Sequence, residues 1–187
     1  MEGIASIDFS VLNALQNTIR CDFLDMVLAF FGTIGNAGLC WITAAIIMLF
    51  FRKTRAAAVM MLAAMALGFL IGDMIVKPIV ARPRPFLINT DINLFIKAPS
   101  GYSFPSGHSC AGFASATVLL LTHRKLGFAA LGLAAVIAFS RLYCYVHYPS
   151  DVLCGIVLGI LSALLIVVLF RKTAFDRKIL NIGYKIK

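Results

Sequence analysis

Long uncharged stretches dominate the pattern of hydrophobic and polar positions in this sequence. Five runs carry almost no charge: residues 26–51, 56–76, 106–122, 126–140 (continuing past Arg141 to residue 146) and 152–170. Each is long enough, or nearly so, for a helix to cross the hydrocarbon core of a bilayer. The pattern therefore predicts an all-α integral membrane protein, a bundle of five clear transmembrane helices.

The first of these runs contains Gly32, Gly35 and Gly38 near its middle. Glycine is unfavourable inside a helix, so the run favours a broken helix over one continuous span. The alternative is a short interfacial helix followed by a span that starts at about residue 37.

The N-terminal segment has a different pattern, with apolar residues every three or four positions. These are Phe9, Leu12, Leu15 and Ile19, and the polar residues Ser10, Asn13, Gln16 and Asn17 lie between them. The spacing predicts an amphipathic helix that lies in the membrane interface, packs on the bundle or supplies a sixth span. We thus divide the chain into an N-terminal amphipathic segment (1–24), a membrane domain (25–170) and a basic cytoplasmic tail (171–187).

Composition agrees with this picture. Of the 187 residues, 61% are hydrophobic and 13% are charged, which excludes both an ordinary soluble domain and a disordered chain. The five cysteines are scattered and show no CxxC spacing, so neither a disulfide framework nor a zinc site is indicated.

The net charge is +9, from 17 basic and 8 acidic residues. The basic residues fall into groups according to the loop that carries them. Eleven basic residues follow the first, third and fifth runs: Arg52, Lys53, Arg55, Arg124, Lys125, Arg171, Lys172, Arg177, Lys178, Lys185 and Lys187. If the runs alternate in direction, all eleven lie on one face, which the positive-inside rule makes cytoplasmic. The C-terminus is then cytoplasmic, and no nucleic-acid partner is needed to explain the charge.

Three polar clusters lie at helix ends on the opposite face. The first holds Lys77 and Arg84, the second is 105–108, and the third runs from 140 to 151. Cations near a membrane surface are costly unless an anion pairs with them, and the guanidinium fork of arginine fits a phosphate. A turn entering a helix at residues 105–107 would add backbone N–H groups aimed at the same anion. We therefore expect a phosphate site on this face.

His147 and Asp151 are four residues apart in the third cluster. A carboxylate that binds one ring nitrogen of a histidine fixes its tautomer and leaves the other nitrogen free to attack. Pro149 disfavours helical geometry at the residue before it, so the pair is expected to straddle a helix start. For Lys77 the alternative is an ion pair with Asp73 one turn earlier.

Some polar residues are interpreted as packing or snorkelling side chains rather than site residues. These are Arg82, Lys97 and His123.

The spacings Lys77-x6-Arg84-Pro85, Pro105-Ser106-Gly107-His108 and Ser140-Arg141-x5-His147-x3-Asp151 resemble the three signature motifs of the type-2 phosphatidic acid phosphatases. This family is a membrane branch of the superfamily shared with vanadium haloperoxidases, and the resemblance covers about residues 25 to 170. The resemblance implies that His147 is the nucleophile, forming a phosphohistidine, that Asp151 orients it, and that His108 protonates the leaving oxygen and then activates water. It also implies that five residues bind the substrate phosphate: Lys77, Arg84, Ser106, Gly107 and Arg141.

The resemblance further implies a lipid phosphatase that needs neither metal nor cofactor and acts on a membrane lipid phosphate or diphosphate at the extracytoplasmic face. Undecaprenyl diphosphate is the favoured substrate. Phosphatidylglycerophosphate and phosphatidic acid stay open as substrates, as do phosphotransfer to a second lipid, binding without turnover and the oligomeric state. The connection 86–104 is expected either to dip into the outer leaflet and guide a lipid tail or to pack over the bundle.

Overall fold

The computed structural model describes residues 2–172, in which every regular element is a helix and no strand forms. The all-α prediction is therefore confirmed for this range, whereas nearly all of the basic tail predicted at 171–187 lies outside the described residues. The elements are α1 (Glu2–Thr18), α2 (Asp22–Ile34), the 3₁₀ turn η1 (Asn36–Gly38), α3 (Leu39–Leu49), α4 (Arg55–Phe69), the π-helical η2 (Leu70–Val76), α5 (Lys77–Val80), α6 (Pro85–Ile88), α7 (Gly107–Thr122), α8 (Arg124–Tyr143) and α9 (Pro149–Lys172).

Three helical stretches of the described chain are long and apolar enough to cross a membrane: Arg55–Ile88, Arg124–Tyr143 and Pro149–Lys172. The pair α2 and α3 is a fourth if its two halves form one span. Helix α7 is apolar but shorter, with 16 residues. The membrane bundle is thus supported, and the count of five holds if both the bent pair and α7 cross the bilayer.

The break predicted in the first run is present. Helices α2 and α3 meet at an angle of 51°, and Gly38 has a φ of +68°, which glycine adopts without the steric cost other residues would meet. Gly35 lies so close to α8 that a Cβ there would be 2.8 Å from Ile137 Cγ2. The glycines therefore bend the chain and allow it to approach the bundle.

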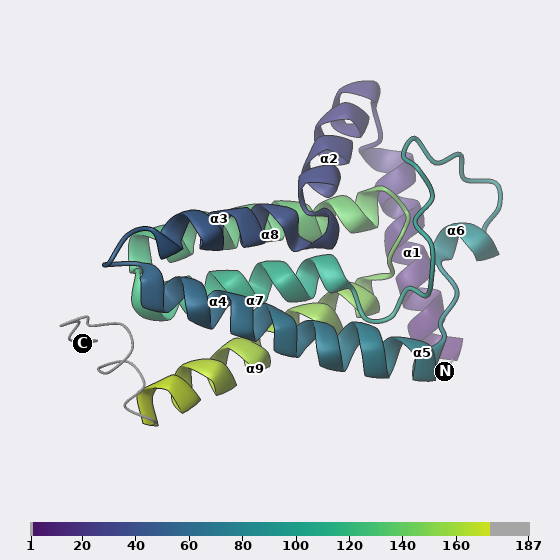
Figure 1. Cartoon of the computed structure of the whole chain (residues 1–187). Coiled ribbons are helices and arrows are strands. Elements are labelled where there is room, and N and C mark those ends of the chain that lie inside the picture. Colours follow the sequence, from purple (N-terminus) through teal and green to yellow (C-terminus); the bar gives the residue numbers. More distant parts are fainter. Residues whose placement is uncertain (1, 173–187) are drawn as a thin grey trace.

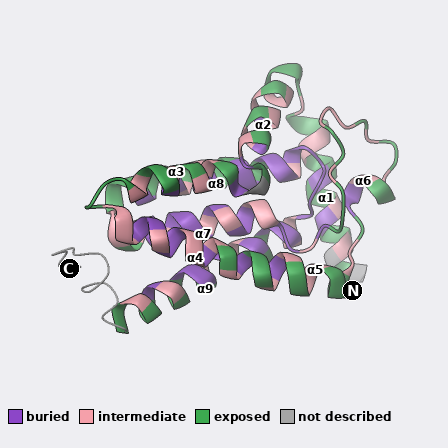
Figure 2. Cartoon of the chain, in the orientation of Figure 1, coloured by how far each residue is buried: buried purple, intermediate pink, exposed green. Residues whose placement is uncertain are grey.

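Helix α7 forms the centre of the bundle, where the buried residues concentrate between α4, α8 and α9 (Figure 2). Glycines allow α9 to contact α7 directly: a Cβ on Gly155 would lie 2.4 Å from the carbonyl oxygen of Ser106, and one on Gly159 would lie 2.4 Å from that of Cys110. This close approach fixes the start of α9 against the start of α7.

The basic turns share one end of the bundle (Figure 1). The α3–α4 turn, the α7–α8 turn and the end of α9 lie together there, and Lys53 and His123 of the two turns are joined by a contact of 3.1 Å between the Lys53 carbonyl oxygen and His123 Nε2. The described basic residues after the first, third and fifth runs therefore gather at one end, and its cytoplasmic assignment stays a prediction.

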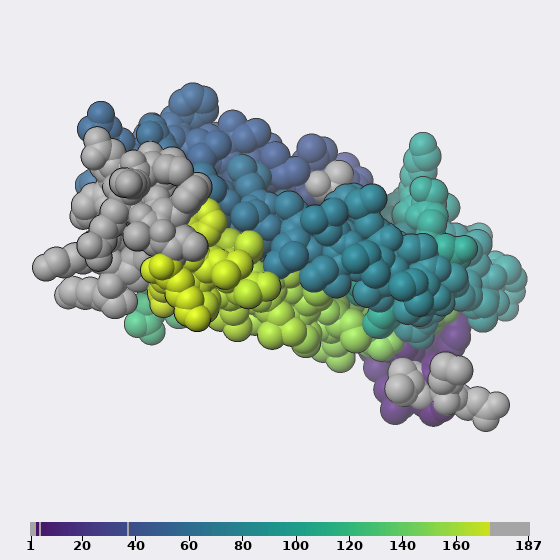
Figure 3. All heavy atoms as spheres, turned by 60° about the horizontal axis from the view of Figure 1, so that its bottom comes forward, coloured from purple at the N-terminus to yellow at the C-terminus, as the bar shows by residue number. Residues whose placement is uncertain are grey.

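Helix α1 lies across the opposite end, beside the start of α9 (Figure 3). Its Leu12 is fully buried against Tyr145 and Tyr148. Of the arrangements considered for the amphipathic segment, packing on the bundle is the one observed.

Candidate active site

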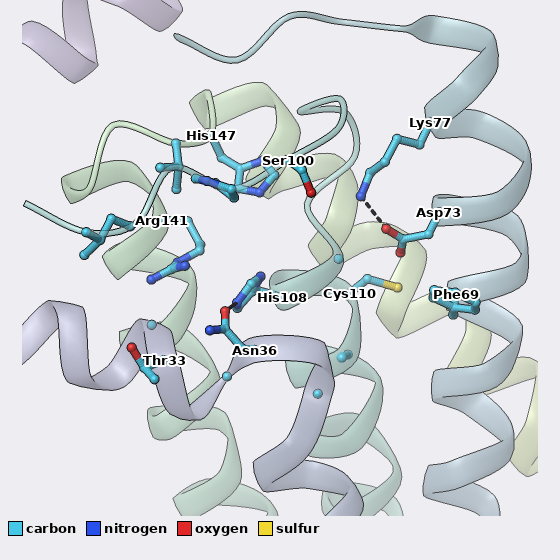
Figure 4. A pocket seen from close by; sticks show the side chains of 18 of the residues that line it. Thr33, Asn36, Phe69, Asp73, Lys77, Ser100, His108, Cys110, Arg141 and His147 are labelled. Atoms are coloured by element: carbon cyan, nitrogen blue, oxygen red, sulfur yellow. Dashed lines mark hydrogen bonds and ion pairs between the residues drawn. The ribbon is translucent and has the colours of Figure 1, made fainter. Parts of the chain in front are cut away.

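A cavity of about 920 Å³ opens at this end of the bundle. Six of the eight site residues predicted from the sequence line it, namely Lys77, Arg84, Gly107, His108, Arg141 and His147. The other two, Ser106 and Asp151, are fully buried behind its wall. The three polar clusters, which are far apart in the sequence, therefore converge on one space (Figure 4).

Arg84 is buried and held by the loops on either side of it. Its Nε donates to the carbonyl oxygen of Gly101 at 3.0 Å, Nη2 to that of Ser100 at 3.1 Å and Nη1 to that of Val146 at 2.9 Å. Pro85, at the first position of α6, follows it directly. The guanidinium is thus oriented by backbone carbonyls.

Arg141 is in the last turn of α8 and is also buried. It fits only because the facing residue of α2 is Gly32: a Cβ there would lie 1.4 Å from Arg141 Nη2. Between residues 2 and 172, neither Arg84 nor Arg141 has a carboxylate within ion-pair distance. Two buried cations facing one cavity without counter-ions form a site for an anion.

Lys77 forms an ion pair with Asp73, the alternative considered for it (Figure 4). Both side chains line the cavity. Asp73, in η2, lies close to the N-terminus of α7: a Cβ on Gly107 would be 3.1 Å from Asp73 Oδ2. Lys77 therefore reaches the phosphate site with its charge already balanced.

Ser106 has a local structural role. As the N-cap of α7, its hydroxyl accepts from the backbone N–H of Ser109 at 3.4 Å and from the Ser109 hydroxyl at 3.0 Å. Its own backbone N–H donates to the carbonyl oxygen of Asp151 at 3.0 Å. The structure places Gly107, and not the Ser106 side chain, on the cavity wall.

His147 lies between an arginine and a carboxylate. On one side Arg84 Nη1 is 3.3 Å from its Nε2, and on the other its Nδ1 is 3.4 Å from Asp151 Oδ2. Arginine can only donate, so Nε2 carries the lone pair and the ring proton is on Nδ1, facing Asp151. The separation of 3.4 Å between Nδ1 and Asp151 Oδ2 is long for a hydrogen bond.

Asp151 is in the first turn of α9 and has no exposed surface. Its Oδ2 also accepts the backbone N–H of Tyr148 at 2.9 Å. The prediction that His147 and Asp151 straddle a helix start is confirmed, because α9 begins at Pro149, between them.

Burial lowers the pKa of His147 to about 4, against the opposing effect of its contact with Asp151, and the charges of Arg84 and Lys77 lower it further. The imidazole is therefore neutral at physiological pH, as a nucleophile must be.

His108 faces His147 from the first turn of α7, and its Nε2 is 3.0 Å from Asn36 Oδ1 of η1 (Figure 4). The broken helix thus contributes a wall of the cavity. Among residues 2–172, no three His, Cys, Asp or Glu side chains are grouped so that they could hold a metal ion.

Sequence reasoning missed four residues around the site: Asn36, Asp8, Arg82 and Lys97, which lines the cavity although it was interpreted above as a packing or snorkelling side chain. Asn36 contacts His108, while Arg82, interpreted above as a packing residue, joins Asp151 to Asp8 of α1. The only sequence signal for Asn36 is the glycines beside it. A membrane helix can break only where its freed backbone groups find other hydrogen-bond partners, so glycines at a break can mark such a place.

Comparison with known proteins places this geometry in a wider group. The model of the PAP2 superfamily matches residues 53–175. An undecaprenyl-diphosphatase of Sulfolobus acidocaldarius is 31% identical over 160 residues, which cover 84% of this chain and 76% of that protein. The bacitracin transport permease protein BcrC of Bacillus licheniformis is 35% identical over 104 residues, which cover 56% of this chain and 51% of that protein.

Two crystal structures have similar folds. LpxE of Aquifex aeolicus superposes with a TM-score of 0.75 and 26% identity, covering 87% of this chain and 95% of that one. A PAP2-type phosphatidylglycerolphosphate phosphatase of Bacillus subtilis superposes with a TM-score of 0.74 and 27% identity, covering 99% of this chain and 90% of that one.

Proposed function

Because this chain belongs to the PAP2 superfamily and is a membrane lipid phosphate hydrolase, we propose that it removes the terminal phosphate of undecaprenyl diphosphate at the extracytoplasmic face of the membrane. The reaction proceeds through a phosphohistidine on His147 and yields undecaprenyl phosphate and inorganic phosphate.

One observation carries the proposal. Two buried arginines without carboxylate partners face the same cavity as a neutral histidine whose Nε2 points away from its orienting carboxylate. A phosphate bound between Arg84 and Arg141 would balance their charge and bring its phosphorus next to His147 Nε2.

In the first step, the lone pair of His147 Nε2 bonds to the terminal phosphorus while the bond from that phosphorus to the bridging oxygen breaks. The leaving oxygen takes a proton from the imidazolium form of His108, which becomes neutral. The N–H of Arg84 that faced His147 Nε2 now donates to a phosphate oxygen. Asp151 stabilises the positive charge that forms on the imidazole.

In the second step, His108 takes a proton from water as the water oxygen attacks the phosphorus. The bond between phosphorus and Nε2 breaks, inorganic phosphate leaves, and His147 is neutral again with its proton on Nδ1. Arg84, Arg141 and Lys77 stabilise the phosphoryl oxygens in both steps, a task performed by Mg²⁺ in many phosphoryl-transfer enzymes.

The apolar side of the cavity supports a lipid substrate. Its lining there comes from α3 and α4 and includes Ile42, Leu62, Met65 and Phe69. A cavity of about 920 Å³ falls in the range that holds a drug-sized ligand. It is large enough for the diphosphate and the first isoprene units, so the rest of the tail would stay in the bilayer. The name of the Sulfolobus acidocaldarius relative agrees with this substrate.

The direct test is phosphate release from undecaprenyl diphosphate by the purified protein with a chelator present. We expect wild-type protein to release phosphate and His147→Ala to lose at least about 1,000-fold, since the nucleophile is gone. His123→Ala, at the opposite end of the bundle, serves as the matched control and should keep wild-type activity. Vanadate should inhibit, because it mimics five-coordinate phosphorus. Phosphate release that survives in His147→Ala would disprove the mechanism.

A second candidate, phosphatidylglycerophosphate hydrolysis, is favoured by the superposition on the Bacillus subtilis phosphatase over nearly the whole chain. Comparing kcat/KM for undecaprenyl diphosphate, phosphatidylglycerophosphate and phosphatidic acid decides between these substrates. Analysis of lipid products with an acceptor lipid present separates hydrolysis from phosphotransfer.

A further inference from the structure

Helix α1 lies outside the residues matched by the family model, yet it holds the loop between α8 and α9 that carries His147. Gln16 Nε2 donates to the carbonyl oxygen of Tyr143 at 2.8 Å, at the end of α8. The hydroxyl of Tyr145 donates to Asn13 Oδ1 at 2.7 Å. The loop is therefore attached to α1 just before the histidine.

Asp8 makes the next attachment, on the far side of the histidine. Its side chain is almost fully buried, and its Oδ1 accepts the backbone N–H of Ser150 at 3.0 Å. Its Oδ2 accepts the Ser150 hydroxyl at 2.5 Å and Arg82 Nη2 at 2.7 Å. A buried carboxylate with charge-assisted partners is tightly fixed in place.

Arg82 connects Asp8 to Asp151. Its Nη1 is 2.7 Å from Asp151 Oδ1, and its guanidinium stacks on the ring of Tyr148 at 3.7 Å from the ring centroid. The other oxygen of Asp151, Oδ2, faces His147. These contacts thus connect α1 to His147 through Arg82 and Asp151.

We propose that Asp8 is a positioning residue for catalysis: by holding Arg82 it fixes Asp151 against His147. This inference rests on the function proposed above. The cluster has two carboxylates, Asp8 and Asp151, for one guanidinium, and its remaining negative charge balances the cation that forms when His147 is phosphorylated. Without the charge of Asp8, Arg82 loses one of the two carboxylates that hold it, and Asp151 is no longer fixed against His147.

Asp8→Asn tests the inference, because it keeps the shape of the side chain and removes its charge. We expect kcat to fall about 10-fold while KM for undecaprenyl diphosphate changes less than about 2-fold, since the phosphate-binding cations are untouched. Asp8→Glu restores the charge and should recover part of kcat. Asp22→Asn is the matched control: Asp22 is an exposed carboxylate at the start of α2, and kcat should not change.

A double-mutant cycle distinguishes positioning from general stability. If Asp8 acts through Arg82, Arg82→Gln should lower kcat at least as much as Asp8→Asn, and the double variant should lose nothing further. Additive losses in the cycle, or wild-type kcat in either single variant, would overturn the inference. Should Asp8→Asn not fold, Arg82→Gln alone decides by the same criterion of kcat against KM.

The same assays separate this inference from the proposed function. If wild-type protein is active and His147→Ala is inactive while Asp8→Asn matches wild type, only the role of Asp8 is lost. If wild-type protein releases phosphate from no lipid, the proposed function fails and the role of Asp8 fails with it.

Discussion

Four of the basic side chains near His147, the proposed nucleophile, fall into two pairs according to their partners. Lys77 and Arg82 are already bound to carboxylates, whereas Arg84 and Arg141 contact carbonyl oxygens, a serine hydroxyl and the histidine itself. A phosphate that enters the cavity therefore gains most from the two arginines without counter-ions. The two paired cations set the local charge and geometry.

A second point at the scale of single residues concerns Gly32, which leaves space for the side chain of Arg141. In Gly32→Ala the new Cβ would overlap Arg141 Nη2, from which it would be 1.4 Å away, so the guanidinium must leave its position. We expect kcat/KM for a lipid diphosphate to fall by about 100-fold, in line with the loss of one preorganised charge contact in a transition state.

Gly132→Ala on α8 is the matched control for this substitution, because a Cβ there has no neighbour within 4 Å. It should keep wild-type kcat/KM and raise helix stability by up to about 1 kcal/mol. Equal activity in the two alanine variants would show that Arg141 tolerates displacement.

Single residues also mark the limit of what the sequence could predict. His108, His147, Asp151 and the motif cations could be recognised because their spacing depends on the chemistry they perform. Asp8 and Asn36 could not, because each acts through one partner that is distant in the sequence: 142 residues separate Asp8 from Ser150, and 72 separate Asn36 from His108. No local pattern encodes such a pairing.

At the scale of elements, the connection 86–104 packs over the bundle in part, and its role in guiding a lipid tail stays a prediction. Leu94 packs with Leu12 and the tyrosines of the loop between α8 and α9, and the ring of Phe95 lies 5.8 Å from that of Tyr143. Ile96, in contrast, lines the cavity. Part of the connection therefore covers the bundle, and the part that follows forms a wall of the substrate site.

This division predicts that Ile96 contacts the lipid portion of the substrate. Ile96→Ser should lower kcat/KM for a long-chain lipid diphosphate by about 10-fold and leave activity on a short soluble phosphate within about 2-fold, because one apolar contact is lost. Leu87→Ser is the control, since Leu87 is 59% exposed and does not line the cavity. An equal loss on both substrates would assign Ile96 a packing role instead.

The helices could be predicted where the signal for them lies in residues that are close together in the sequence. Apolar runs indicated the helices, three glycines indicated the bend between α2 and α3, and an apolar stripe indicated α1. The π-helical turn of η2 was not foreseen. It lies between α4 and α5 and contains Asp73, and its extra residue per turn has no sequence signature, although such turns are frequent at functional sites.

At the scale of the whole molecule, the basic turns and the cavity lie at opposite ends of the bundle. The turn after α3, the turn after α7 and the end of α9 form a basic end, and the cavity opens at the other end. If the basic end is cytoplasmic, the site takes its substrate from the outer leaflet.

Cysteine labelling in intact cells tests this orientation. In a background with Cys21→Ser and Cys154→Ala, which removes the two exposed cysteines, Thr90→Cys should react with a membrane-impermeant maleimide. Arg52→Cys should react only after permeabilisation. Both positions are exposed and lie at opposite ends of the bundle. The reverse labelling pattern would place the active site in the cytoplasm.

The attachment of α1 to the start of α9 has a consequence for biosynthesis. Asp8 precedes Ser150 and Asp151 by more than a hundred residues, so it is made well before them. Until α9 is made, Asp8 lacks its partner Ser150, and His147 lacks its partner Asp151. A chain that stops before α9 therefore lacks Asp151, and we expect it to be inactive on membrane lipids.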